Sequence, residues 1–373
     1  MKSKKVIVHV VDSLGEGGAQ TLIYEYAKGM SKDYEIFVMT IYPSSSLNYK
    51  RICQFAKIET VYSARNFFTR AFNKVFGFIY VPYKYKKIIK KIKPDVLHLH
   101  LLSLGFIWHI RRSLKGIKLF YTCHSAPYRM FDEERKTEGK AAKSLIHENG
   151  MRIIALHDEM RKEINERFFC DNTVVINNGI DIKHYSEIAV DKYALKESLG
   201  IRKESFIVGH VGRFQKVKNH FFLIDVFSEI KKQRDNAYLI LIGTGALRNA
   251  VVEKTQELGI IDKVLFLSDR TDVLELLKIM DVFVFPSITE GLSIALLEAQ
   301  AAGVKCIVSD SINKANVLSE TTIPISLDSP ASEWAKKALD TSIKNHNYGN
   351  LNDYDISQSI SSLEMLYFGE GDS

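Results

Sequence analysis

The sequence lacks the patterns that define several protein classes. No apolar run approaches the roughly 18–20 residues of a membrane-spanning helix, because Phe76–Pro82 is too short and Val96–Ile110 carries three histidines. The four cysteines are scattered and form no C-x-x-C pair. Their spacing excludes a cysteine-built metal or redox motif and favours reduced thiols in a cytoplasm. Seven prolines and 21 glycines in 373 residues also exclude a linker-rich or low-complexity chain.

Two nucleotide-binding fingerprints are missing as well. No G-x-x-x-x-G-K-[ST] occurs, which excludes a P-loop. Gly15, Gly17 and Gly18 open a helix after the first predicted strand, but Gln20 stands where the dinucleotide fingerprint needs its last glycine. A hydride-transfer enzyme is therefore disfavoured. Free N–H groups at such a helix start can still hold an anion. We interpret the loop as facing a phosphate or sugar, with an ordinary tight turn as the alternative.

The composition that is present is typical of a soluble globular protein. Apolar residues make up 46% and charged residues 25%, as in ordinary folded domains. At roughly 150 residues per domain, the length predicts two domains. The apolar stretch Val6–Val11 is short and is followed by Asp12. We therefore expect a first β-strand there rather than a signal peptide, and a protein that is not exported.

Predicted strands alternate with predicted helices twice along the chain, which favours parallel sheets with right-handed crossovers. The predicted strands are Val6–Val11, Glu35–Ile41, Val96–His100, Leu119–Cys123, Arg152–Leu156, Val174–Asn177, Phe206–Val211, Tyr238–Ile242, Val264–Leu267, Val282–Pro286 and Lys305–Ser309. The predicted helices are Ala19–Met30, His220–Lys232, Leu247–Leu258, Thr271–Met280, Gly291–Ala302 and Ser357–Phe368. The pattern restarts near Phe206, so we place the junction of the two halves between Asp181 and that residue.

Positive charge is concentrated in the first half of the chain. Residues 1–180 hold 30 Lys/Arg and 17 Asp/Glu, whereas the remainder holds 21 and 27. Segment 65–93 alone holds nine Lys/Arg, no acidic residue and eight interleaved Phe and Tyr residues. Cations attract anionic lipids, and aromatic rings sit at headgroup level. The segment is therefore predicted to dock on an anionic membrane surface. A solvated helix face is the main alternative, and nucleic-acid binding is disfavoured.

Charged side chains follow two predicted strands of the second half. Arg213 follows one strand and Lys218 comes five residues later, at the sheet edge where α/β folds bind ligands. A planar fork and a point charge suit a diphosphate. Glu290 lies at a strand-to-helix junction, and Glu298 would be about 12 Å farther along that helix. This is roughly the span from a sugar to the ribose of a nucleotide diphosphate, and carboxylates accept hydrogen bonds from vicinal hydroxyls. A solvated basic loop and a surface glutamate are the alternatives.

Three histidines lie at or just after strand ends of the first half. His98 and His100 share one face of their strand, and His124 follows the next strand. The H-x-H pattern invites a metal interpretation, but no third ligand of suitable spacing stands out. The sequence therefore favours core or cleft-lining roles for His98 and His100, and contact with substrate for His124.

Together these motifs resemble the family 4 retaining glycosyltransferases of GT-B fold, above all the bacterial members that build capsular or extracellular polysaccharide. The resemblance covers nearly the whole length and rests on Gly15–Gly18, Asn177–Asp181, Gly212–Asn219, Asp281–Ser287 and the E-x₇-E pattern from Glu290 to Glu298. It implies an α/β architecture of two Rossmann-like domains whose parallel sheets face a central cleft. Residues 1–185 would bind the acceptor, with a C-terminal helix within 355–373 packing back on them. Residues 186–354 would bind the nucleotide-sugar donor.

The resemblance also implies a role for each site residue. Glu290 and His124 are the candidate catalytic residues, one holding hydroxyls of the donor sugar and the other near the transferred sugar. The donor-binding candidates are Arg213 and Lys218 at the diphosphate, Gly291, Leu292 and Ser293 at sugar and phosphate, Glu298 at the ribose and Arg270 at the base. Gly15, Gly17 and Gly18 would border the diphosphate and the acceptor.

The implied activity is transfer of a hexose from a nucleotide sugar, with UDP as the favoured nucleotide, to a lipid-linked glycan. The anomeric configuration would be retained, because the leaving phosphate helps to deprotonate the acceptor on the same face. No cofactor and no metal are expected. The enzyme would be peripheral, at the cytoplasmic face of the cell membrane. A non-catalytic GT-B partner subunit is one alternative. A GT-B sugar-nucleotide epimerase, which would release UDP without an acceptor glycan, is another.

Overall fold

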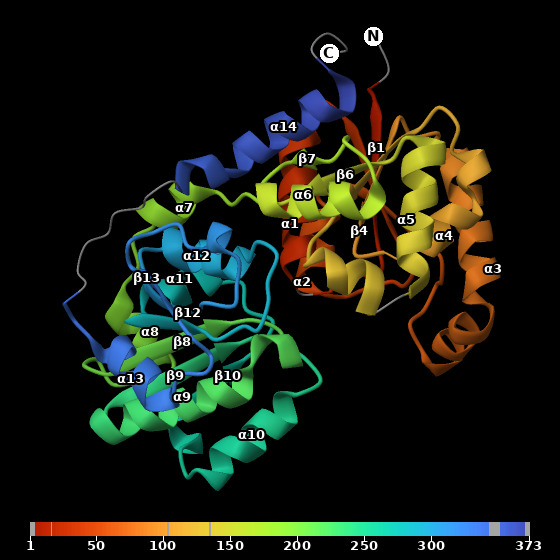
Figure 1. Ribbon diagram of the computed structural model, residues 1–373. Helices are drawn as coiled ribbons and strands as arrows, with labels where there is room; N and C mark the ends of the chain where they lie inside the picture. The colour runs from red at the N-terminus through yellow and green to blue at the C-terminus, as the bar shows by residue number, and fades with distance from the viewer. Residues whose placement is uncertain (1–3, 16, 103, 134–135, 343–350, 370–373) are drawn as a thin grey trace. The chain divides into compact units, whose positions relative to one another are not determined.

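The computed structural model describes residues 4–15, 17–102, 104–133, 136–342 and 351–369, and it divides into two compact units (Figure 1). Unit 1 consists of Met1–Asn178 together with Ile356–Ser373, and unit 2 consists of Gly179–Asp355. The chain thus completes unit 1 only after it has passed through unit 2. The sequence had suggested a division after residue 185 and a return at residue 355.

Unit 1 is built on a sheet of seven parallel strands in the order β3-β2-β1-β4-β5-β6-β7. The strands are β1 (Val6–Val11), β2 (Glu35–Thr40), β3 (Lys57–Thr60), β4 (Val96–His100), β5 (Lys118–Thr122), β6 (Arg152–Ala155) and β7 (Val174–Val175). The α-helices are α1 (Gly18–Met30), α2 (Leu47–Ile52), α3 (Phe67–Ile92), α4 (Leu104–His109), α5 (Lys136–Asn149), α6 (Asp158–Phe168) and α14 (Ile356–Phe368). A one-turn 3₁₀-helix, η1 (Arg111–Ser113), and a π-helical turn, η2 (Arg129–Glu133), complete the unit.

Unit 2 repeats the same design with six parallel strands in the order β10-β9-β8-β11-β12-β13. The strands are β8 (Phe206–Val211), β9 (Ala237–Ile242), β10 (Val264–Leu267), β11 (Val282–Phe285), β12 (Lys305–Ser309) and β13 (Thr322–Ile325). The α-helices are α7 (Ile182–Glu187), α8 (Lys192–Ser198), α9 (His220–Gln233), α10 (Arg248–Glu257), α11 (Val273–Lys278), α12 (Ile294–Ala301) and α13 (Ala331–Leu339). Its 3₁₀-helices are η3 (Lys216–Lys218), η4 (Ile261–Lys263), η5 (Lys314–Asn316) and η6 (Leu351–Tyr354).

The predicted architecture of two parallel α/β sheets is confirmed. In each sheet the strand order reverses beside the first strand of the unit, between β1 and β4 and between β8 and β11. Ligands of such sheets bind outside the carboxyl ends of the strands at this reversal. The loops that follow β1, β4, β8 and β11 are therefore the places where a site is expected.

Both faces of the unit 2 sheet are buried, which explains its nearly continuous apolar strands. Phe206 and Val208 belong to one core with α9 and α13, whereas Ile207 belongs to the opposite core with α11 and α12. Trp334 of α13 is fully buried in the first of these cores. Successive strand residues thus alternate between two apolar layers.

The same kind of hydrogen bond occurs at the amino-terminal edge of each sheet. Asp95 precedes β4, and its side chain accepts a hydrogen bond from the backbone N–H of Val6 at 2.7 Å. Asp281 precedes β11 and accepts from the N–H of Ile207 at the same distance. In each unit one carboxylate therefore joins the first strand to the strand beyond the reversal, at the edge opposite to the expected site.

Candidate active site

The carboxyl edge of the unit 2 sheet brings together the donor motifs that the sequence singled out. Lys218, at the end of η3, and Glu290, in the loop between β11 and α12, form an ion pair with Nζ and Oε1 2.7 Å apart. Both side chains are mostly buried, 16% and 13% exposed. The N–H of Ile288 donates to the carbonyl of Val217 at 2.8 Å. Residues 72 apart in the sequence are thereby fixed side by side at the reversal of the strand order.

The start of α12 is fixed by a residue that the sequence analysis did not single out. Asn316 is buried, accepts a hydrogen bond from the N–H of Ser293 at 2.8 Å and donates to the carbonyl of Gly291 at 2.8 Å. Ser293 is the N-cap of α12, and its hydroxyl accepts from the N–H of Leu296. The amide of Ser293 is thus engaged inside the protein, next to the amides of Gly291 and Leu292.

Glu298 lies in the middle of α12 and is only 8% exposed. Its Oε1 accepts a hydrogen bond from the hydroxyl of Tyr185 in α7 at 2.7 Å. A buried carboxylate held by a hydroxyl has a defined direction, as a residue that receives ribose hydroxyls needs. Tyr185 was missed because a single tyrosine 113 residues from its partner carries no local sequence signal.

The two predicted donor-binding arginines lie in different surroundings. Arg213 is half-buried in the loop after β8, directly before Phe214, which is fully buried. Arg270 forms a two-pronged ion pair with Asp272, with Nε and Oδ1 2.7 Å apart. This hydrogen bond lowers the pKa of the Asp272 carboxyl. Arg270 is therefore held in place by its own loop.

The Gly243-Thr-Gly245 turn after β9 has a packing role. A Cβ on Gly243 would lie 2.1 Å from the carbonyl oxygen of Gly212, and one on Gly245 would lie 2.6 Å from the backbone of Phe214. Both glycines have positive φ, 151° and 152°, which L side chains rarely adopt. The two glycines thus allow the β9 loop to support the loop that carries Arg213.

In unit 1 the glycine loop lies at the carboxyl end of β1, as expected. Gly17 is the N-cap of α1, and no side chain caps this helix. The side-chain amide of Asn48 donates to the carbonyl of Gly15 at 3.2 Å, and that of Gln20 donates to Ser13 at 3.1 Å. Gln20, which stands in place of the last glycine of the dinucleotide fingerprint, therefore ties the first turn of α1 to Ser13. Gly18 begins the helix itself.

Three imidazoles form a hydrogen-bonded chain that ends at His124. Nδ1 of His9 in β1 lies 3.1 Å from Nε2 of His100, and Nδ1 of His100 lies 3.0 Å from Nε2 of His124. Burial lowers the pKa of His9 and of His124 to about 4 and that of His100 well below its usual range. All three rings are therefore neutral at pH 7. Each nitrogen–nitrogen contact needs one proton, so the rings must share one tautomer.

His98 lies beside this chain, with its ring centre 4.0 Å from that of His100, but it has other hydrogen-bond partners. Its two ring nitrogens face the hydroxyls of Tyr367 in α14 and of Thr122 in β5, the latter at 2.7 Å. His9, His98 and His100 offer nitrogens within 4.8 Å of one another. If His98 and His100 were to bind a metal ion, the third ligand would thus be His9, which the sequence analysis did not consider. Both ring nitrogens of His98 and of His100 take part in the hydrogen bonds described above.

The basic and aromatic segment 65–93 contains one long helix, α3. Asn66 and Thr69 cap its start with reciprocal hydrogen bonds. Its later part packs on unit 1 through Val81, Tyr85 and Ile89. Within the described residues, no helix has the length and apolarity to cross a membrane.

Comparisons with known proteins match almost the whole chain. Residues 16–184 match the family model of Glycosyltransferase Family 4, and residues 191–352 match that of Glycosyl transferases group 1. The capsular polysaccharide biosynthesis glycosyltransferase CapH of Staphylococcus aureus is 26% identical over 98% of this chain and 99% of its own. The UDP-Gal:alpha-D-GlcNAc-diphosphoundecaprenol alpha-1,3-galactosyltransferase of Escherichia coli is 31% identical over 62% of each chain.

Solved structures agree with this assignment at the level of the fold. The crystal structure of Anabaena HepE in complex with UDP and glucose has a TM-score of 0.78 to this chain. It covers 97% of this chain and 99% of HepE at 17% identity. The fold is therefore GT-B, as the sequence predicted.

Proposed function

We propose a function from one premise: the chain belongs to the glycosyltransferases, with a family 4 domain at residues 16–184 and a group 1 domain at 191–352. The enzyme transfers a hexose from a UDP-sugar to a lipid-linked glycan during capsular or extracellular polysaccharide synthesis. The anomeric configuration is retained, and no metal ion takes part. The names of the Escherichia coli and Staphylococcus aureus relatives and the ligands of the HepE complex support the proposed donor, acceptor and polysaccharide product.

The observation that carries the proposal is the ion pair between Lys218 and Glu290 at the reversal of the strand order. In the resting protein each side chain neutralises the other. An arriving nucleoside diphosphate attracts Lys218 and, from the same loop region, Arg213. Glu290 then accepts hydrogen bonds from hydroxyls of the donor sugar. Cations aimed at the leaving diphosphate stabilise the charge that develops as the glycosidic bond breaks.

The nucleoside end of the donor lies at Glu298 in this proposal. Its carboxylate accepts hydrogen bonds from the two ribose hydroxyls while Tyr185 fixes its orientation. The amides of Gly291 and Leu292 face the sugar and phosphate, and Arg270 lies by the base. In unit 1, the loop of Gly15, Gly17 and Gly18 borders the acceptor.

The experiment that tests the donor site is calorimetric titration with UDP, GDP and ADP in the presence of EDTA. We expect UDP to bind, and Arg213→Ala and Glu298→Ala each to weaken binding by about 10–100-fold, as losing a charged hydrogen bond predicts. Arg202→Ala and Glu257→Ala are matched controls, because both side chains are exposed in the same unit. Absence of nucleotide binding by the folded wild type would instead favour the non-catalytic partner subunit.

Product analysis separates the transferase from an epimerase. With a UDP-sugar and a lipid-linked glycan, a transferase releases UDP only in step with a longer glycan. An epimerase releases UDP without any acceptor. The anomeric configuration of the product, measured by its proton coupling constants, tests retention.

We propose that the enzyme acts at the cytoplasmic face of the membrane, because its proposed acceptor is linked to a lipid. The six lysines between residues 84 and 93 would each contribute about 1 kcal/mol near an anionic surface. Replacing all six with serine should weaken co-sedimentation with phosphatidylglycerol vesicles at least tenfold, and neutral vesicles serve as the control. Undiminished binding of this variant would refute membrane docking.

A further inference from the structure

The first part of α3 exposes an apolar stripe that the donor site does not explain. Phe68, Phe72, Phe76, Ile79 and Tyr83 follow one another at intervals of three or four residues, so they share one face of the helix. Their exposed fractions run from 43% for Phe72 to 79% for Phe68. Side chains of this size are normally buried, and a contiguous exposed set marks a binding surface.

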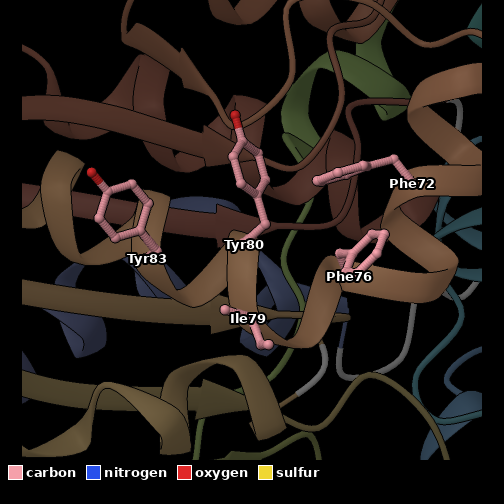
Figure 2. A pocket seen from close by; sticks show the side chains of 5 residues that line it. All are labelled: Phe72, Phe76, Ile79, Tyr80 and Tyr83. Atoms are coloured by element: carbon pink, nitrogen blue, oxygen red, sulfur yellow. The ribbon is translucent and has the colours of Figure 1, made fainter.

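Side chains of the stripe border an open pocket on the surface of α3 (Figure 2). The pocket has a volume of about 280 Å³ and an apolar surface, and it is lined by Phe72, Phe76, Ile79, Tyr80 and Tyr83. This volume is close to the lower end of small-molecule sites, roughly 300 Å³. The pocket therefore suits a section of a flexible hydrocarbon chain better than a polar ligand.

Stacked tyrosines connect the pocket to the carboxyl edge of the sheet. Tyr42 follows β2 and Tyr62 follows β3, and their rings stack with centroids 5.3 Å apart. Tyr62 stacks in turn on Tyr80 of the pocket, also at 5.3 Å. The guanidinium of Arg65 lies 5.7 Å from the ring centre of Tyr42. A stack of aromatic rings, with Tyr62 buried in its middle, thus joins the carboxyl ends of β2 and β3 to Tyr80 of α3.

Charge on α3 and the residues just before it is of one sign. Arg65 and Arg70 lie near the start of α3, and no acidic residue occurs between residues 65 and 93. At about 100° per residue, Lys86, Lys87 and Lys90 continue the face of the stripe toward the helix end, and all three are exposed. A molecule that fits this surface carries a strongly anionic group next to a long apolar chain.

We infer that the α3 pocket binds the isoprenoid chain of a polyprenyl diphosphate-linked acceptor, with the diphosphate toward Arg65 and the carboxyl edge of the sheet. The chain lies in the pocket on the exposed face of α3, and the stack of Tyr42, buried Tyr62 and Tyr80 supports the pocket from the protein side. Lys86, Lys87 and Lys90 face the anionic lipids that surround such an acceptor. This inference rests on the proposed glycosyl transfer to a lipid-linked glycan, and it assigns the segment that recognises the lipid.

The test compares two phenylalanines of the same helix. Phe76 lines the pocket and is 51% exposed, whereas Phe78 is 56% exposed but lies outside it. Both serine variants should fold, because neither ring is buried. The probe is farnesyl diphosphate, kept below its micelle concentration and titrated by calorimetry, with inorganic diphosphate as the head-group control.

We expect Phe76→Ser to weaken the binding of farnesyl diphosphate at least tenfold. Phe78→Ser should change this affinity less than twofold. Inorganic diphosphate should bind both variants as weakly as it binds the wild type. Equal losses in the two variants would mean a general lipid-facing surface and would overturn the pocket assignment, as would absence of binding to the wild type. A wild type that binds UDP but not farnesyl diphosphate refutes this inference alone. The reverse result refutes the donor site alone.

Discussion

His220 should make unit 2 sensitive to mild acid. The ring is 2% exposed, stacks on Phe214 with centroids 4.3 Å apart and has no hydrogen-bond partner for either nitrogen among the described residues. Burial, and secondarily the charge of Lys218, lower its pKa from 6.5 to about 4. Between about pH 6.5 and pH 4, His220 therefore binds a proton in the unfolded state but stays neutral in the folded state. Stability is fully present above pH 6.5 and is lost as the pH falls toward 4.

The size of the effect follows from the two pKa values. At pH 5 the unfolded state is almost fully protonated at this residue and the folded state is not. The free energy of unfolding should thus be about 2 kcal/mol lower than at pH 7.5 from His220 alone. Burial also lowers the pKa of His210 in the same unit, which adds in the same direction. The substitution His220→Leu should remove the part of this decrease in the free energy of unfolding that comes from His220.

The assay is urea unfolding at pH 7.5 and pH 5 followed by fluorescence. The chain has two tryptophans, so a Trp108→Phe background leaves Trp334, which is fully buried in the unit 2 core, as the reporter. His109→Leu, at an exposed histidine, is the matched control. The variant should lose about 2 kcal/mol less between the two pH values than the control does. An identical loss in both would refute the reasoning, whatever the stability at pH 7.5.

Three further predictions concern unit 2. Tyr185→Phe should weaken UDP binding by roughly tenfold, because it removes a hydrogen bond to a carboxylate; calorimetry that finds unchanged affinity would contradict a positioning role. Gln300→Leu should cost about 2–4 kcal/mol in urea unfolding, since the amide oxygen accepts from the buried backbone of residues 318 and 319; near-native stability would disprove this. Gly245→Ala should destabilise more than Gly200→Ala, because both have positive φ but an added Cβ at 200 meets open space; equal melting temperatures would rule it out.

Central strands could be predicted from the sequence, and of the four edge strands β7 and β10 were predicted but β3 and β13 were missed. β1, β8 and β12 have the bounds that their apolar runs predicted, because strands buried on both faces leave an unbroken signal. β3 (Lys57–Thr60) and β13 (Thr322–Ile325) lie at sheet edges. One alternates charged and apolar residues, and the other contains Pro324, which an edge strand tolerates. These four-residue segments therefore carried no strand pattern.

The site shows the same division between local and distant information. Lys218 and Glu290 could be selected because each stands in a motif beside a strand end. Asn316, Tyr185 and His9 could not, because each acts through partners far away in the sequence. The positions of these three depend on how strands and helices pack, which no local pattern records.

The return of α14 to unit 1 has a consequence for how the protein is made. His98 stays without its tyrosine partner, and Asn177 without Ser359, until the end of the chain arrives. Unit 2, by contrast, is a continuous segment. At typical rates of synthesis the ribosome needs roughly 10–40 s to pass from residue 178 to the end. Throughout that interval the sheet of unit 1 lacks α14, and the ring of Phe120 has no contact with Tyr367. The packing of unit 1 is therefore completed only after the whole segment of unit 2 has been synthesised.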